Sequence, residues 1–178
     1  MTETHIRYKV SSEDYRIARL AALAICIHVL ESALPSPIPG IKPGLANVIS
    51  IAVFFIYGWR AAVWVSLLRV VVGSLIIGSF LTPTFMLSLA GSLATLLILF
   101  AVLPLKKLGL GPVGAAVLAA MGHITGQFLL AYFLIIPNPG LFYLFPPLLT
   151  AALIFGLVTG LIAQNLLDRL ESKQEHEY

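Results

Sequence analysis

Long apolar runs, separated by short stretches of Gly, Pro and charged residues, divide the chain into six segments. They cover approximately residues 15–34, 45–57, 61–78, 84–103, 113–136 and 146–167. All but the second fall within the range of about 17–25 residues that a membrane-spanning helix needs. The short second segment predicts a re-entrant or broken start, which is tolerated at membrane depth only when it is buried in protein or lines a cavity.

The apolar runs favour helices over barrel strands. A membrane barrel strand alternates apolar and polar residues, whereas runs such as Leu96–Phe100 are apolar throughout. Composition agrees, because 59% of the 178 residues are hydrophobic and 11% are charged, against about 25% charged in soluble domains. These values exclude a soluble enzyme and a disordered chain. We predict an all-α integral membrane protein with a six-helix transmembrane domain at 15–168.

The basic residues predict the orientation of this domain. Residues 1–14 are polar and lack the pattern of a secretory signal, so the first apolar segment is expected to remain as a helix. The polar tail at 169–178 is expected to be solvated, with no fold of its own. With both termini in the cytoplasm, nine of the eleven Lys and Arg lie on the cytoplasmic side: Arg7, Lys9, Arg16, Arg19, Arg60, Lys106, Lys107, Arg169 and Lys173.

A few polar residues remain within or beside the apolar segments, where each needs a partner or a function. At about 1.5 Å per residue, Arg69 lies roughly 13 Å from the cytoplasmic side, His123 roughly 15 Å and Gln127 roughly 21 Å. The others lie toward the outer side, which predicts a cavity open to the outside and closed toward the cytoplasm. We predict that it binds an anionic or strongly polar solute through Glu31, Lys42, Asn47, Arg69, Ser88, His123 and Gln127.

Each of these residues also has a structural interpretation, and the sequence leaves both open. Arg69 can pair with Glu31 or cap backbone carbonyls. His123 can be a hydrogen-bonded interior residue, since Gly122 and Gly126 beside it form a helix-packing surface. Lys42 can be an ordinary interfacial charge, and His28 is expected to be structural. The single cysteine excludes an internal disulfide and a cysteine-rich metal site, so no metal or cofactor is expected.

The chain contains the motifs Pro39–Asn47, Arg69, Phe85–Gly91, and Gly122-His123 with Gly126-Gln127. These motifs resemble the Gx transporter family, also called heptaprenyl diphosphate synthase component one. Pro43 and Ile124 depart from the family pattern, which usually has an aliphatic residue and Asn there. This family is similar to the S-components of energy-coupling-factor transporters, which bind a vitamin or metal on the outer side. The resemblance implies a coupling subunit with ATPases as partners, and a contact through Ala18 and Ala22.

Two main classes of function follow, and a structural or assembly subunit of a membrane redox complex stays open as a third. The first is a binding and transport protein in the bacterial cytoplasmic membrane, which lacks a Walker loop and so needs ATPase partners or an unidentified route. The second is a non-catalytic membrane component of heptaprenyl diphosphate synthase. A catalytic prenyl synthase holds Mg²⁺ on carboxylates, whereas Asp14 and Asp168 lie at opposite ends of this chain. No stripe of basic residues interleaved with aromatics indicates a nucleic-acid partner.

Overall fold

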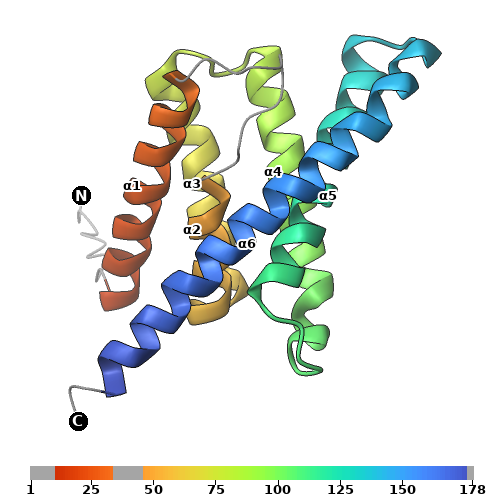
Figure 1. Cartoon of the computed structure of the whole chain (residues 1–178). Helices are drawn as coiled ribbons and strands as arrows, with labels where there is room; N and C mark the ends of the chain where they lie inside the picture. Colours follow the sequence, from red (N-terminus) through yellow and green to blue (C-terminus); the bar gives the residue numbers. More distant parts are fainter. Residues whose placement is uncertain (1–10, 34–45, 176–178) are drawn as a thin grey trace, which may run out of the picture.

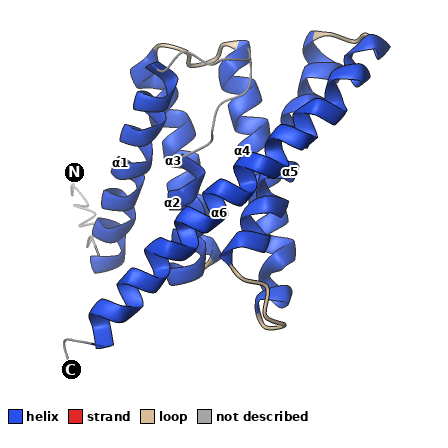
Figure 2. Cartoon of the chain, in the orientation of Figure 1, coloured by secondary structure: helices blue, strands red, loops and turns tan. Residues whose placement is uncertain are grey.

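The computed structural model describes residues 11–33 and 46–175, and all regular structure in these ranges is helical (Figure 2). It comprises six α-helices, with a π-helical turn and a 3₁₀ helix between the last two. Their bounds are α1 Ser12–Ala33, α2 Ala46–Tyr57, α3 Trp59–Ile77, α4 Pro83–Lys106, α5 Pro112–Leu130, η1 Ala131–Ile135, η2 Pro139–Leu144 and α6 Phe145–Glu175. The predicted all-helical class is confirmed for the described residues.

Among the described residues, four helical stretches are long and apolar enough to cross a membrane: Trp59–Ile77, Pro83–Lys106, Pro112–Ile135 and Pro139–Leu170. Large apolar side chains on their outer surfaces are exposed, including Leu97 at 69% and Leu161 at 59%. A soluble monomer rarely exposes apolar patches on this scale, whereas lipid covers them in a membrane. The chain is therefore a multi-pass membrane protein.

The two remaining helices differ from these four in charge or length. Helix α1 has 22 residues, but Glu13, Asp14, Arg16 and Arg19 make its first two turns polar. Helix α2 has 12 residues, so it is about 18 Å long and cannot cross a hydrocarbon core of about 30 Å. The predicted short second segment is thus present as a short helix.

Helix α2 lies at the centre of the molecule and packs against α1, α3, α5 and α6. Its residues Val48 to Phe54 are all buried, as expected for a helix that is apolar on every side. Helix α6 crosses α5 and α2 obliquely (Figure 1). The α1–α3 and α4–α5 pairs complete the bundle.

Successive helices alternate in direction (Figure 1). The first residue of α1 and the last residue of α6 therefore lie at one end of the molecule, the lower end in Figure 1. The connection between α3 and α4 and the segment with η1 and η2 lie at the upper end. The lower end therefore contains the charged starts of α1 and α3 and the charged end of α4.

Three helices extend beyond their predicted ends for local reasons. Helix α1 begins early because the Ser11 hydroxyl accepts from Asp14 N–H at 3.2 Å and caps its first turn. Helix α4 continues past Pro104 because the last turn tightens, with Lys107 N–H donating to Pro104 O at 3.2 Å. Helix α6 continues through Glu175, so it includes most of the tail for which no fold was expected, since that segment is rich in helix-forming residues.

Close approach at glycines holds α5 against both of its neighbours. A Cβ on Gly126 would lie 2.6 Å from Ala94 Cβ, and one on Gly122 would lie 2.5 Å from Ile98 Cγ1, both in α4. On α6, a Cβ on Gly160 would lie 2.6 Å from Val113 Cα. Small residues at these positions let the helix backbones touch, which is how helices associate without a hydrophobic driving force in lipid.

Candidate functional site

A cavity of about 450 Å³ lies between the helices, in the half of the molecule away from the first residue of α1. It extends from the end of α1 and the start of α2 to the first half of α6. Every predicted site residue that the structure describes lines it: Glu31, Asn47, Arg69, Ser88, His123 and Gln127. Lys42, the remaining predicted site residue, lies outside the described residues.

Arg69 lies in the middle of α3 and is 5% exposed. Its Nη1 donates to Asn47 Oδ1 at 2.7 Å, and its guanidinium interacts electrostatically with Glu31. Its Nε–H has no hydrogen-bond acceptor among the described residues. A buried donor without an acceptor is costly, so this atom is a candidate contact for a ligand.

Glu31 and His28 form the α1 side of the cavity. Glu31 is 5% exposed. The His28 ring packs against α3, where a Cβ on Gly73 would lie 2.8 Å from His28 Cδ2. The absence of a side chain at Gly73 is therefore what lets α1 bring these polar groups up to α3. His28 was expected to be structural, and this contact is compatible with that role.

His123 joins α5 to α4 at the opposite side of the cavity. Thr95 Oγ1 lies 3.2 Å from His123 Nδ1 and donates to Ala119 O at 3.3 Å. Thr95 has one hydroxyl hydrogen, so the direction of its hydrogen bond with His123 Nδ1 follows the tautomer of the ring. The ring edge and Gln127 pack onto Gly91, where a Cβ would lie 2.6 Å from His123 Nε2. The ring is thus held in one orientation.

Other residues that line the cavity were not singled out from the sequence. The polar ones include Ser74, Ser79, Thr84 and Thr159. A wall of small and aromatic side chains from α5 and α6 completes it, with Ala116, Ala119, Ala120, Ala151, Ala152 and Phe155. In the sequence, pairs of neighbouring alanines in these two helices could have predicted this wall, because small side chains leave space between helices.

A packed core lies between α2, α3 and α4. Ser66 in α3 donates to Ser50 in α2 at 3.0 Å. Phe54, Val65 and Leu99 are fully buried there.

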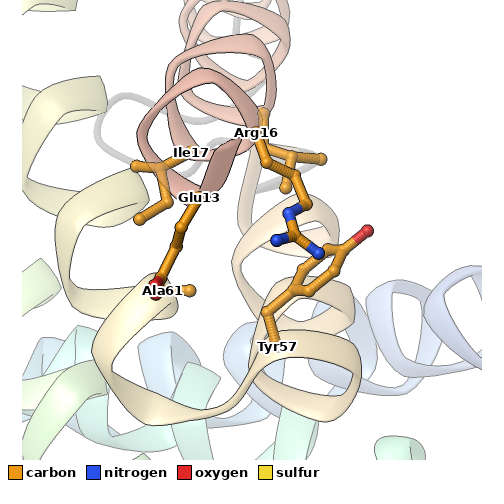
Figure 3. Close-up of a pocket in the computed structure, with 6 residues that line it drawn as sticks. Glu13, Arg16, Ile17, Tyr57 and Ala61 are labelled. Carbon is orange, nitrogen blue, oxygen red and sulfur yellow. The ribbon is translucent and has the colours of Figure 1, made fainter. Parts of the chain in front are cut away.

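A smaller hollow of about 170 Å³ lies at the lower end, between the start of α1 and the α2–α3 connection (Figure 3). The Arg16 guanidinium carbon lies 5.0 Å from the centroid of the Tyr57 ring, which it covers. Figure 3 shows Glu13 extending toward Ala61 on the other side of this hollow. Arg16 and Tyr57 thereby link α1 to α2, an attraction between a cation and an aromatic face.

No cluster of three or more His, Cys, Asp or Glu side chains suited to a metal ion occurs among the described residues.

Comparison with known proteins then places the chain in a family. The family model for heptaprenyl diphosphate synthase component I matches residues 20–166. The chain belongs to the heptaprenyl diphosphate synthase component I family. The match runs from α1 into α6 and includes all described residues that line the large cavity. A search of curated proteins and a search of solved structures each found no significant match.

Ala18 and Ala22, the residues expected to contact a partner helix, are both exposed on α1 of this component I family member. Cys26, one turn further along, is exposed as well. Gly156 and Gly160, in contrast, pack within the molecule, against α5. Ala18 lies before the first residue matched by the family model.

Proposed function

We propose that this protein binds a small polar or anionic solute, of vitamin or vitamin-precursor size, on the outer side of a bacterial cytoplasmic membrane and takes part in its transport. The observation that carries the proposal is the buried Arg69, whose Nε–H has no acceptor among the described residues and which lines a cavity of about 450 Å³. Ligand pockets commonly measure about 300–1,000 Å³.

The proposed residues have distinct roles. Arg69 binds a negatively charged or strongly polar group of the solute, and Asn47 orients Arg69. Ser88, His123 and Gln127 hydrogen-bond other polar groups of the solute from α4 and α5. Glu31 balances the buried positive charge of Arg69, because a buried charge is stable only when it is paired.

The proposed orientation puts the lower end of the molecule in the cytoplasm. Helices α1 and α3 begin at that end and α4 ends there, so Arg16, Arg19, Arg60, Lys106 and Lys107 are gathered on one side (Figure 1). Positively charged residues are enriched on the cytoplasmic side of membrane proteins. The cavity, in the other half, then lies toward the outer side.

Transport in this proposal is driven by partners, as in the S-components of energy-coupling-factor transporters. The exposure of Ala18 and Ala22 on α1 supports a contact with a coupling subunit, because small exposed residues let another helix approach closely. The ATPases would bind that subunit and not this chain.

A ligand screen with two arginine variants tests the binding proposal. The parent protein, Arg69→Gln and Arg60→Gln are purified and their thermal unfolding is followed with a panel of vitamins and phosphorylated precursors. Arg60 begins the same helix but is exposed, so it is the matched control. We expect at least one solute to stabilise the parent and Arg60→Gln, by about 2.7 kcal/mol at a hundred times its Kd, but not Arg69→Gln. Equal stabilisation of all three proteins would contradict the assignment of Arg69.

The family match favours a second function, a non-catalytic membrane component of heptaprenyl diphosphate synthase. Prenyl-transfer rates and product lengths measured with the catalytic subunit, with and without this chain, test it. A change in rate or chain length on adding the protein supports this function. Unchanged kinetics in the presence of reconstituted protein exclude it.

A further inference from the structure

Helix α2 begins inside the molecule, beside the large cavity. Asn47 lies in its first turn and Ile51 lies one turn later, and both line the cavity. The first N–H groups of an α-helix have no acceptor within the helix, and they carry partial positive charge. The cavity is therefore bordered by a helix N-terminus.

Arg69 lies at the same place. Its Nη1 is held by Asn47 Oδ1 at 2.7 Å, which fixes the plane of the guanidinium. The side chain is 5% exposed, and its Nε–H lacks an acceptor among the described residues. A guanidinium edge with two parallel N–H groups matches a carboxylate, which it binds bidentately.

The charged side chains that line the cavity indicate which charge a ligand would carry. Arg69 is the one Lys or Arg, and Glu31 the one carboxylate, among the described residues that line it. The described part of the lining therefore offers one guanidinium to a negatively charged group, which suits a single carboxylate better than a diphosphate, since a diphosphate needs several cations or Mg²⁺ on carboxylates.

The rest of the cavity is suited to an apolar group. Ala120, Ala151 and Ala152 leave space between α5 and α6, and Phe155 adds an aromatic surface. An aromatic or branched aliphatic body fits such a wall, because burying apolar area is favourable and no polar partner is required there.

Building on the proposed function, we infer that the ligand is an organic monocarboxylate with a largely apolar body. Its carboxylate lies between the Arg69 guanidinium and the N-terminus of α2, and its body contacts the alanine wall of α5 and α6.

Matched acids and amides test this inference on the full-length protein in detergent. The probes are benzoate and benzamide, cyclohexanecarboxylate and its amide, and 2-naphthoate and 2-naphthamide, with inorganic phosphate as a further anion. Binding is measured by equilibrium dialysis. We expect at least one acid to bind about tenfold or more tightly than its amide and more tightly than phosphate. In Arg69→Gln this preference disappears, whereas Arg60→Gln keeps it.

A second variant tests the apolar wall and does not alter the charge. Ala152→Phe is expected to weaken 2-naphthoate binding about tenfold and to leave benzoate binding within about twofold, since only the larger ring system reaches the wall. The preference of the parent protein for acids over their amides tests the charge of the ligand even if Arg69→Gln does not fold. Amides that bind as tightly as their acids overturn the inference. Binding of a neutral or cationic solute when no acid binds overturns it too. In both cases the proposal that the protein binds a solute is unaffected. Failure of every solute in both screens overturns the binding function as well.

Discussion

The Lys106 ammonium, at the end of α4, donates to the backbone carbonyl of Phe55 across 3.2 Å. Phe55 lies in the last turn of α2, whose final carbonyl groups have no partner within the helix. The same ammonium lies 4.6 Å from the centroid of the Phe55 ring and 5.1 Å from that of Phe54. One side chain therefore caps the short central helix and ties it to α4.

Replacing this lysine should destabilise the bundle. Lys106→Met keeps the length and apolar stem of the side chain but removes the charge that caps α2. We expect the free energy of unfolding to fall by about 1–2 kcal/mol, because a charge-assisted hydrogen bond to a helix C-terminus is lost. Reversible unfolding in mixed detergent measures it. Lys107→Met, an exposed neighbour, should change the value by less than about 0.5 kcal/mol; equal effects would show that Lys106 is not a specific cap.

The hydroxyl of Thr95 should matter both for stability and for the orientation of His123. Thr95→Val removes the group that lies 3.2 Å from His123 Nδ1 and leaves that buried ring nitrogen without this partner. We expect a loss of about 1–3 kcal/mol in the free energy of unfolding. Thr95→Ser keeps the hydroxyl and should recover most of it. A serine variant as unstable as the valine variant would assign the effect to packing and not to the hydrogen bond.

A methyl group at Gly126 should separate α4 from α5. Its Cβ would lie 2.6 Å from Ala94 Cβ and 2.8 Å from Ala90 O, and the second of these is backbone that cannot move without shifting the helix. We expect Gly126→Ala to lower the free energy of unfolding by about 1–3 kcal/mol. Gly111→Ala is the control, because the nearest atom to its Cβ would lie 3.9 Å away. Equal thermal unfolding midpoints for Gly126→Ala and Gly111→Ala would contradict this packing.

The start of α1 should respond to acid. The Ser11 N–H and hydroxyl both donate to the Asp14 carboxylate, at 2.8 and 2.9 Å, and these bonds hold the pKa of Asp14 below its usual value. A lowered carboxylate pKa stabilises the folded helix end above pH of about 4, and the stabilisation is lost as pH falls through the folded pKa. An NMR titration should show the Asp14 pKa rising part of the way toward its usual value in Ser11→Ala, because the Ser11 N–H still donates to the carboxylate. An unchanged pKa would contradict the role of the Ser11 hydroxyl.

Much of the architecture could be predicted from the chain because membrane burial leaves a strong one-dimensional signal. Apolar runs located the six α-helices of the described residues, and the shortness of the second run predicted the short helix α2. The ends were predicted less well, since capping by Ser11 and the continued helix after Leu170 depend on local hydrogen bonds and not on hydropathy.

The candidate site was predicted from the energetic cost of placing polar groups in apolar segments. This reasoning identified Arg69, His123 and Glu31, because a polar group within a membrane segment is energetically unfavourable unless it has a partner or a function. That the described members of the predicted set line one cavity is a finding of the structure. Their role in binding stays a prediction.

The sequence by itself determined that the chain is helical, that it belongs in a membrane and which polar residues had to be accommodated there. Only the tertiary structure decided that Arg69 donates to Asn47, that Thr95 holds His123 and that alanines of α5 and α6 leave a space beside them. Hydropathy depends on each residue separately and can be summed along a chain. A cavity depends on how helices far apart in sequence cross, and that is set by close contacts such as those at Gly126 and Gly160.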